Sequence, residues 1–323
     1  MLFDNNLGRE GSQEVEFPAQ VSPAKMEMQK EVVVIAVEST KKDELPEEPR
    51  KTKPTTWSGV DGRGITFLFP YSKEFQTEII GNGGDTFSVF HQNVQYLNNS
   101  VEELQAFLAD IPCDVVCITE HWMSEDQIKF AILENCNLVS HFCRDLHKHG
   151  GSAIYVSKKH NAEKLEEINK LSRLNVFECC GAEIFVNKRK VVVLCVYRPP
   201  SSDVSEFILH FENALTVSLQ LSSFVFIAGD FNVNILEQSA SERYFTDVLD
   251  SCSFKITITE PSRVTETSAT CLDNILVPSH IFDDINCKKV MPTGYSDHFA
   301  QLVTSHTSEE IAASCTLKWK SFI

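Results

Sequence analysis

Short runs of apolar residues, each closed by a polar break, recur between residues 86 and 305 and predict buried strands. The predicted strands are 87–92, 114–119, 137–143, 151–157, 177–185, 191–196, 224–228, 273–277 and 299–303. Between them, apolar residues repeat at helical spacing over 99–110, 125–133, 205–219 and 242–249. Strands interspersed with helices predict an α/β or α+β sandwich.

Polar side chains follow several of these strands directly. The run at 224–228 ends in Gly229, Asp230, Phe231 and Asn232. Asp230 and Asn232 are two residues apart, so an extended backbone would point both side chains to the same side. Taken alone, an Asx-rich turn leaving a strand explains this stretch more simply. However, polar residues recur past other strand ends, which favours a functional site. These are Asn93, Glu120, Tyr197 and the pair Asp297 and His298.

Residues 1–85 differ in amino-acid composition from the segment that follows. Glu, Lys, Pro, Ser and Thr dominate, as in ESTKKDELPEEPRKTKPTT at 38–56, and predict a mostly disordered tail. Some local structure is expected at 66–70. The basic run at 50–53 fits either a nuclear-import patch or a solvated charge run. The glycine-rich stretch 81–85 predicts a hinge into a folded domain at 86–305, and 306–323 resembles a linker fragment.

Composition narrows the function. The formal charge of −16 and the pI near 5.1 argue against a protein that coats nucleic acid non-specifically, because phosphate contacts need Lys and Arg. A nuclease stays open, since its carboxylates can hold a cation that meets the phosphate. Eleven scattered cysteines without a CxxC pair predict reduced thiols and an intracellular location. No signal segment or membrane anchor is predicted.

The polar residues past the strand ends indicate chemistry at a hard metal ion. Mg²⁺ prefers one or two carboxylates, keeps several waters and takes further ligands from a substrate phosphate. Glu120 and Asp297 are the predicted carboxylate ligands. Asp230 suits a base that deprotonates water, and His298 suits transition-state stabilisation or proton transfer, with Asp273 as its partner. Individually, each residue also fits a surface or turn role. Histidines outside this set are assigned to the surface or the structure.

Seven motifs, in this order along the chain, resemble the endonuclease/exonuclease/phosphatase superfamily, and most of all the apurinic-type endonuclease domains of non-LTR retrotransposons. They are QNVQ at 92–95, DVVCITEHW at 114–122, GGSAI at 150–154, VYRPP at 196–200, GDFNVN at 229–234, TCLDNIL at 270–276 and YSDH at 295–298. The resemblance implies a DNase I-like four-layer sandwich, two stacked mixed β-sheets with helices on their outer faces.

The resemblance also implies roles for the motif residues. Glu120 would bind Mg²⁺, with Mn²⁺ as the alternative ion, and Asn93 and Asp297 would lie close by. Asp230 would act on the nucleophilic water. Asn232 would orient the water and the phosphate, and Tyr197 would donate a hydrogen bond to the phosphate. Asp273 would pair with His298, and Ser296 would support the phosphate or the loop. A threonine common upstream of the aspartate strand could be Thr265 or be replaced by Ser262.

The predicted function is a Mg²⁺-dependent phosphodiesterase that nicks one DNA strand and leaves a 3′-hydroxyl. One alternative keeps the fold and changes the phosphoester, to an RNA end, an inositol phosphate or a phospholipid head group. A second alternative is a retroelement remnant that binds a partner without catalysis. No reverse transcriptase motif follows the domain. The location is expected to be intracellular and nuclear, and the sequence identifies no protein partner.

Overall fold

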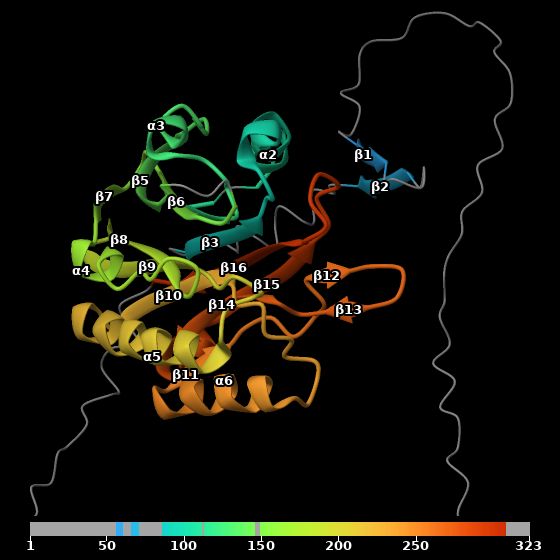
Figure 1. Cartoon of the computed structure of the whole chain (residues 1–323). Coiled ribbons are helices and arrows are strands. Elements are labelled where there is room, and N and C mark those ends of the chain that lie inside the picture. Colours follow the sequence, from blue (N-terminus) through green and yellow to red (C-terminus); the bar gives the residue numbers. More distant parts are fainter. Residues whose placement is uncertain (1–55, 61–65, 71–85, 112, 146–148, 308–323) are drawn as a thin grey trace, which may run out of the picture. The chain divides into compact units, whose positions relative to one another are not determined.

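The computed structural model describes residues 56–60, 66–70, 86–111, 113–145 and 149–307 (Figure 1). Two six-stranded mixed sheets dominate residues 86–307. The first sheet has the order β15 (Ile285–Met291), β16 (Ala300–His306), β3 (Thr86–Asn93), β4 (Val115–Thr119), β6 (Ser152–Ser157), β5 (Cys136–Phe142). The second has the order β11 (Phe254–Ile256), β14 (Asp273–Pro278), β10 (Phe224–Asp230), β9 (Arg189–Tyr197), β8 (Glu178–Val186), β7 (Asn161–Lys164).

The central strands are buried on both faces, which explains their continuous apolar runs. In β9, Val191 and Val193 belong to the core between the two sheets. Val192 and Leu194 point the other way, into the core beneath the helices of the second sheet. Because alternate side chains of one strand serve different cores, each central strand joins two layers.

Helices cover the outer face of each sheet. Side chains of α2 and α3 share a core with the first sheet, and those of α4, α5 and α6 share one with the second. The bounds are α2 (Val101–Ala109), α3 (Glu125–Ile128), α4 (Glu166–Asn169), α5 (Val204–Leu221) and α6 (Ala240–Ser251), with 3-10 turns η1 (Leu97–Asn99) and η2 (Ser279–Asp284). The predicted four-layer sandwich is therefore confirmed.

Helix ends follow local capping chemistry. Oδ1 of Asp203 accepts the backbone N–H of Glu206 and caps α5. The helix predicted over 125–133 ends at Ile128. Beyond it, Phe130 and Ile132 are exposed while their neighbours Ala131 and Leu133 are buried, so burial alternates there instead of following the helical period.

The sequence did not predict several short or marginal elements. No helix or strand was predicted within 158–174, which contains β7 and α4, or over 285–291, which forms the edge strand β15. A hairpin of β12 (Arg263–Val264) and β13 (Ala269–Thr270) extends away from the two sheets (Figure 1). An edge strand has one backbone edge facing solvent and carries polar residues among its apolar ones. It therefore lacks the continuous apolar run by which the central strands were predicted.

Most of 1–85 and all of 308–323 lie outside the described residues, so the predictions of a disordered tail, a hinge at 81–85 and a linker fragment stay predictions. Within the tail, β1 (Thr56–Val60) pairs antiparallel with β2 (Thr66–Pro70), where local structure was expected. At the other end β16 continues to His306, one residue past the predicted boundary. None of the described helices has the length and apolar character that a membrane crossing requires.

Candidate active site

Strand directions bring the predicted residues to one edge of the sandwich. β3 runs parallel to β4, and β9 runs parallel to β10, so the carboxyl ends of each pair lie together. β14 and β16 are antiparallel to their neighbours and begin at the same edge. The side chains at these positions come from both sheets: Asn93, Glu120, Tyr197, Asp230, Asp273 and His298. The contacts described below join most of them into one cluster.

The amide of Asn93 links the two sheets. Its Nδ2 donates to Oε1 of Glu120 at 3.0 Å and to Oδ2 of Asp230 at 2.8 Å. The indole Nε1 of Trp122 donates to the other oxygen of Glu120 at 3.0 Å. Two carboxylates from different sheets are thus held on either side of one amide nitrogen.

The backbone after β4 adopts an unusual conformation. Glu120 has φ 54° and Trp122 has φ 54°, in the left-handed region that few non-glycine residues adopt. The N–H of Glu120 donates to the carbonyl of Gly151, and that of Trp122 to the carbonyl of Gly150. A side chain at position 151 would overlap the ring of His121, so the glycine pair permits this close approach.

The residues after β10 form a turn and also contribute side chains to the predicted active site. Oδ1 of Asp230 accepts the backbone N–H of Asn232 at 2.9 Å, which is an Asx-turn, and Asn232 has φ 49°. Nδ2 of Asn232 donates to Oδ2 of Asp230 at 3.2 Å and to the carbonyl of Arg198 at 2.7 Å. Nη1 of Arg198 returns a bond to the carbonyl of Asn232 at 3.0 Å. The turn therefore fixes the Asp230 carboxylate and does not compete with a catalytic role.

His298 and Asp273 form a buried pair. Nδ1 of His298 lies 2.7 Å from Oδ2 of Asp273. The hydroxyl of Ser262 donates to the same oxygen at 2.7 Å and accepts the backbone N–H of Asp273 at 3.0 Å. Behind the pair, Nδ1 of His91 lies 3.9 Å from Oδ1 of Asp273. These contacts hold the imidazole of His298 in one orientation.

Electrostatics raise two pKa values in this cluster. Burial is the largest influence on Asp230, and the negative charges of Asp273 and Glu120 act in the same direction. Together they raise the pKa of Asp230 to about 8, although the positive charge of His298 acts to lower it. Burial alone would lower the pKa of His298, but Asp273, followed by Asp230 and Asp297, raises it to about 9. The crowded carboxylates therefore favour a positive charge among them, from a proton or from a cation.

Tyr197 and Ser296 complete the edge. Tyr197 is buried at the end of β9, and its pKa is raised by burial and by the carboxylates of Glu120 and Asp230, so the phenol stays protonated and can donate. The hydroxyl of Ser296 donates to the carbonyl of Asn93 at 2.7 Å and accepts the N–H of His298 at 3.1 Å. Of its two suggested roles, these contacts are those of a loop support.

Asp297, one of the two predicted carboxylate ligands, forms an ion pair with Arg263. Its Oδ2 accepts Nε and Nη2 of Arg263 at 2.8 and 2.6 Å, and its Oδ1 is 4.0 Å from Nε2 of His298. The side chain is 38% exposed. The structure thus places Asp297 near His298 and in an ion pair with Arg263, and its role as a metal ligand stays a prediction.

The donor set fits a hard divalent cation. Asp230, Asp273 and His298 offer ligand atoms within 4.8 Å of one another, two from carboxylates and one from an imidazole. Glu120 does not belong to that group and offers a further, only partly buried carboxylate. Carboxylate oxygens are the donors that Mg²⁺ prefers. As the side chains lie here, Oδ1 of Asn93 accepts the backbone N–H of Gln95 at 3.2 Å, so coordination through that oxygen would require the amide to turn over. Glu120 is therefore the better-placed ligand.

The sequence assigned no role to three residues of this cluster: His91, Trp122 and Arg198. Trp122 and Arg198 stand inside quoted motifs, beside Glu120 and Tyr197, which was a usable signal. The choice between Ser262 and Thr265 is resolved, since the hydroxyl of Thr265 bonds within the β12–β13 turn to Ser268. His91 carried no signal, because its importance depends on the pairing of β3 with β16.

Solved structures share this fold. The endonuclease domain of TRAS1, a telomere-specific non-LTR retrotransposon, aligns with a TM-score of 0.57 at 14% identity, covering 69% of this chain and 99% of that one. The catalytic domain of Xenopus laevis APE2 aligns with a TM-score of 0.54 at 15% identity, covering 69% and 94%. The 3′ phosphatase NExo from Neisseria, bound to a product DNA hairpin, aligns with a TM-score of 0.54 at 15% identity, covering 67% and 98%.

At the sequence level, no curated protein matches the chain. The Endonuclease/Exonuclease/phosphatase family model matches residues 90–298, which is more than half of the chain and contains every residue of the cluster. The chain therefore belongs to the Endonuclease/Exonuclease/phosphatase family, whose members are phosphoester hydrolases.

Proposed function

We propose that this protein is a divalent-metal endonuclease of the non-LTR retrotransposon type, which nicks one strand of DNA and leaves a 3′-hydroxyl. The observation that carries the proposal is the position of Asp230. Its carboxylate is buried, held by the amides of Asn93 and Asn232, and beside a histidine that is itself oriented by Asp273. This is the arrangement of a base next to a charge-stabilising group.

Each residue has a defined task in the proposed reaction. Asp230 takes a proton from water, and the resulting hydroxide attacks phosphorus. The bond from phosphorus to the 3′ oxygen breaks, and the departing 3′ oxygen takes a proton from solvent, so the products are a 3′-hydroxyl and a 5′-phosphate. Asn232 orients the water and the phosphate, while the phenol of Tyr197 and the imidazolium of His298 donate to the phosphoryl oxygens as their negative charge grows.

A divalent cation, Mg²⁺ in the first place and Mn²⁺ as the alternative, would be held by Glu120, with Asn93 and Asp297 as further candidates. It would supply Lewis-acid polarisation of a phosphoryl oxygen. The raised pKa of Asp230 fits this assignment. Asp230 ionises more readily once a cation offsets the negative charge of Glu120, and only the ionised carboxylate can accept a proton.

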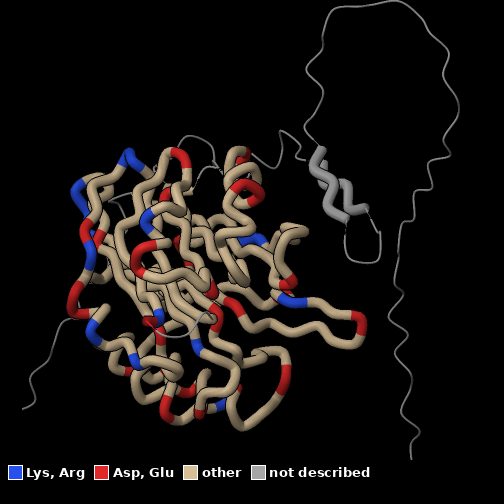
Figure 2. Tube along the Cα trace, turned by 45° about the horizontal axis from the view of Figure 1, so that its top comes forward, with Lys and Arg blue, Asp and Glu red and all other residues tan. Residues whose placement is uncertain are grey.

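DNA is the preferred substrate because of the shared fold and the motif order. TRAS1 is a retrotransposon endonuclease domain by its title, and NExo was solved with a DNA hairpin. The acidic character of the chain is compatible with DNA if cations mediate the contact. Figure 2 shows Lys and Arg at scattered positions, interspersed with Asp and Glu, so most of the phosphate recognition is assigned to the site itself.

Conversion of supercoiled plasmid to the open circular form tests the proposal. We expect nicking with Mg²⁺, none with excess chelator, and a loss of at least about a thousandfold in Asp230→Asn and His298→Ala. Asp247→Asn is the matched control, since Asp247 is an exposed acid on α6. Full activity of Asp230→Asn would refute the assigned base.

Two further experiments on the same protein distinguish the proposed endonuclease from the two alternative functions. A panel of a 3′-phosphate on RNA, an inositol phosphate and a phospholipid would identify a different phosphoester substrate if plasmid stays intact. Calorimetric titration of Mg²⁺, with Glu120→Ala as the comparison, distinguishes an enzyme from a remnant that only binds a partner. A remnant need not bind the ion at Glu120, whereas the proposed enzyme must.

A further inference from the structure

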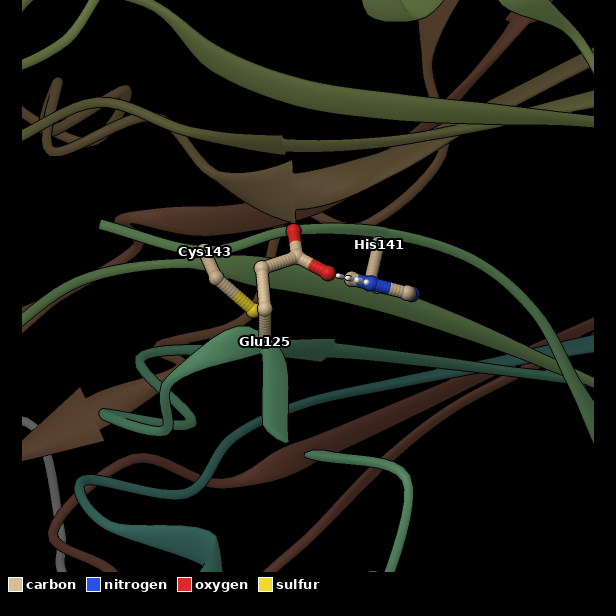
Figure 3. A group of neighbouring side chains, drawn as sticks. All are labelled: Glu125, His141 and Cys143. Atoms are coloured by element: carbon tan, nitrogen blue, oxygen red, sulfur yellow. Dashed lines mark hydrogen bonds and ion pairs between the residues drawn. The ribbon is translucent and has the colours of Figure 1, made fainter. Parts of the chain in front are cut away.

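A second group of metal-ligating side chains lies outside the active site, on the outer side of the first sheet. Glu125, His141 and Cys143 each offer one ligand atom, and these atoms lie within 4.8 Å of one another. Nε2 of His141 is 2.8 Å from Oε2 of Glu125. Figure 3 shows the carboxylate of Glu125 between the thiol of Cys143 and the ring of His141.

The fold places these three side chains together by simple geometry. His141 lies in β5, and Cys143 follows its last residue, two positions on, so both side chains point to the same side of the extended chain. Glu125 is the first residue of α3, whose start is fixed by a capping box between Ser124 and Gln127. One rigid strand end and one capped helix start therefore define the distances within the group.

The donor types select the metal. A thiolate, an imidazole and a carboxylate are the ligands that Zn²⁺ accepts in tetrahedral sites, whereas Mg²⁺ prefers oxygen ligands alone. Three protein donors leave the fourth position for water. Glu125 is 55% exposed and Cys143 is 8% exposed, so the group opens to solvent on the side of the glutamate.

The surroundings favour a cation. Glu125 and Asp145 both act on Cys143 as negative charges. Lys129 acts on it as a positive charge, but its ammonium pairs with Asp126 at 3.6 Å. Among these neighbours negative charge therefore exceeds positive charge.

We propose that Glu125, His141 and Cys143 form a binding site for a zinc-class divalent ion, distinct from the catalytic centre. The ion would tie the start of α3 to the end of β5. The end of β5 also contacts the active-site edge. Phe142 stands between His141 and Cys143, and its carbonyl oxygen lies 2.9 Å from Nε2 of His121, which is next to Glu120 in the sequence. The site would stabilise the segment that follows β4.

Cobalt substitution tests this site without reference to activity. Full-length protein, freed of metal with a chelator and kept reduced, is titrated with Co²⁺ in the presence of excess Mg²⁺ that occupies the catalytic centre. A thiolate ligand gives a sulfur-to-cobalt charge-transfer band, and a tetrahedral site gives intense visible bands. The catalytic cluster contains no cysteine, so the charge-transfer band reports only on a thiolate site.

We expect the band to saturate at one Co²⁺ per chain and to disappear when one equivalent of Zn²⁺ is added. Cys143→Ser should remove it, and His141→Gln should weaken Co²⁺ binding at least tenfold. Cys252→Ser, which changes a partly exposed thiol outside the group, should leave it intact. Zn²⁺ should also raise the melting temperature of the parent chain and not that of Cys143→Ser.

Two results would overturn the proposal. One is the absence of a charge-transfer band in the parent chain. The other is a band that survives in Cys143→Ser, or that Cys252→Ser removes equally, since either would place the thiolate elsewhere. Circular dichroism of the metal-free variants controls for folding, and a variant that is unfolded is replaced by Cys143→Ala, which keeps the small buried side chain apolar.

Discussion

Arg263 donates twice to the same oxygen of Asp297, from Nε at 2.8 Å and from Nη2 at 2.6 Å, and Asp297 itself is the neighbour of His298. Both side chains are more than a third exposed. The guanidinium therefore neutralises a carboxylate that the family resemblance assigns to the metal. Arg263 stands at the base of the β12–β13 hairpin, so the hairpin and the metal site compete for one side chain.

This relationship predicts the sign of a change in metal dependence. In Arg263→Met the Asp297 carboxylate loses its partner and becomes available to a cation. An exposed ion pair contributes about 0.5 to 1 kcal/mol, so the Mg²⁺ concentration for half-maximal nicking should fall about two- to fivefold. Asp297→Asn should raise it. If neither variant changes the Mg²⁺ dependence, Asp297 does not help to hold the ion.

Asp273 should control the pH dependence of the reaction through His298. The charge of Asp273 is the strongest influence that raises the pKa of His298, to about 9, against burial. In Asp273→Asn the largest raising influence is lost while burial remains, so the pKa of His298 falls and less of the imidazole is protonated at pH 8. The alkaline limb of the pH–rate profile should move from near pH 9 to lower pH, with kcat reduced most at the alkaline end.

A purely structural role for Asp273 would lower activity equally at all pH values. Ser262→Ala provides the graded control, because it removes one hydrogen bond to Asp273 and leaves the carboxylate charge. Its alkaline limb should stay within about one pH unit of the parent. A shift as large as that of Asp273→Asn would assign the effect to geometry and not to charge.

Stability of the metal-free protein should decrease as the pH rises. The folded pKa of Asp230, about 8, and that of His298, about 9, both exceed the ordinary values of 3.8 and 6.5. Their contributions are therefore complete below pH 3.8 and 6.5, and are lost as the pH passes 8 and 9. For His298 alone this is on the order of 3 kcal/mol.

Urea unfolding in chelator at pH 5 and pH 8 measures this dependence. Asp230→Asn, which cannot acquire the buried charge, should be more stable than the parent at both pH values, by a clearly larger margin at pH 8 than at pH 5, because the loss begins at pH 3.8 and grows until the pH passes 8. The buried carboxylate thus lowers the stability of the metal-free protein. A less stable Asp230→Asn at pH 8 would contradict the assigned electrostatics.

Gly229 should tolerate no side chain. A Cβ atom there would overlap the carbonyl oxygen of Val196 on the neighbouring strand β9, and backbone atoms cannot move aside. Gly181→Ala meets only the side chain of Ile168, at 2.8 Å. We expect losses of about 3 kcal/mol or more for Gly229→Ala and a smaller loss for Gly181→Ala, measured by thermal unfolding. The reverse order would contradict this explanation.

The sequence predicted those features that depend on local pattern. Strands buried on both faces give continuous apolar runs, and polar residues at their ends, such as Asp230, are visible against that background. The edge strand β15 was missed because its side chains alternate between surface and core with two lysines among them. The short α3 was overextended because apolar residues after Ile128 are exposed.

Contacts between distant residues could not be predicted from local pattern. The pairing of Asp297 with Arg263 and the position of His91 behind Asp273 depend on how strands far apart in sequence are placed. The family resemblance supplied the pairing of Asp273 with His298, but not the hydroxyl of Ser262 that holds it. The orientation of the Asn93 amide requires coordinates of both sheets.

The pairing of β3 with β16 has a consequence for synthesis of the protein. The first strand of the sandwich bonds directly to its last, and His298 immediately precedes that last strand. During translation, a chain that has emerged only as far as β14 holds the base but not the histidine, and its first sheet lacks a central member. The ribosome-bound chain should therefore be unable to cut nucleic acid, including its own template, until the whole domain has left the exit tunnel.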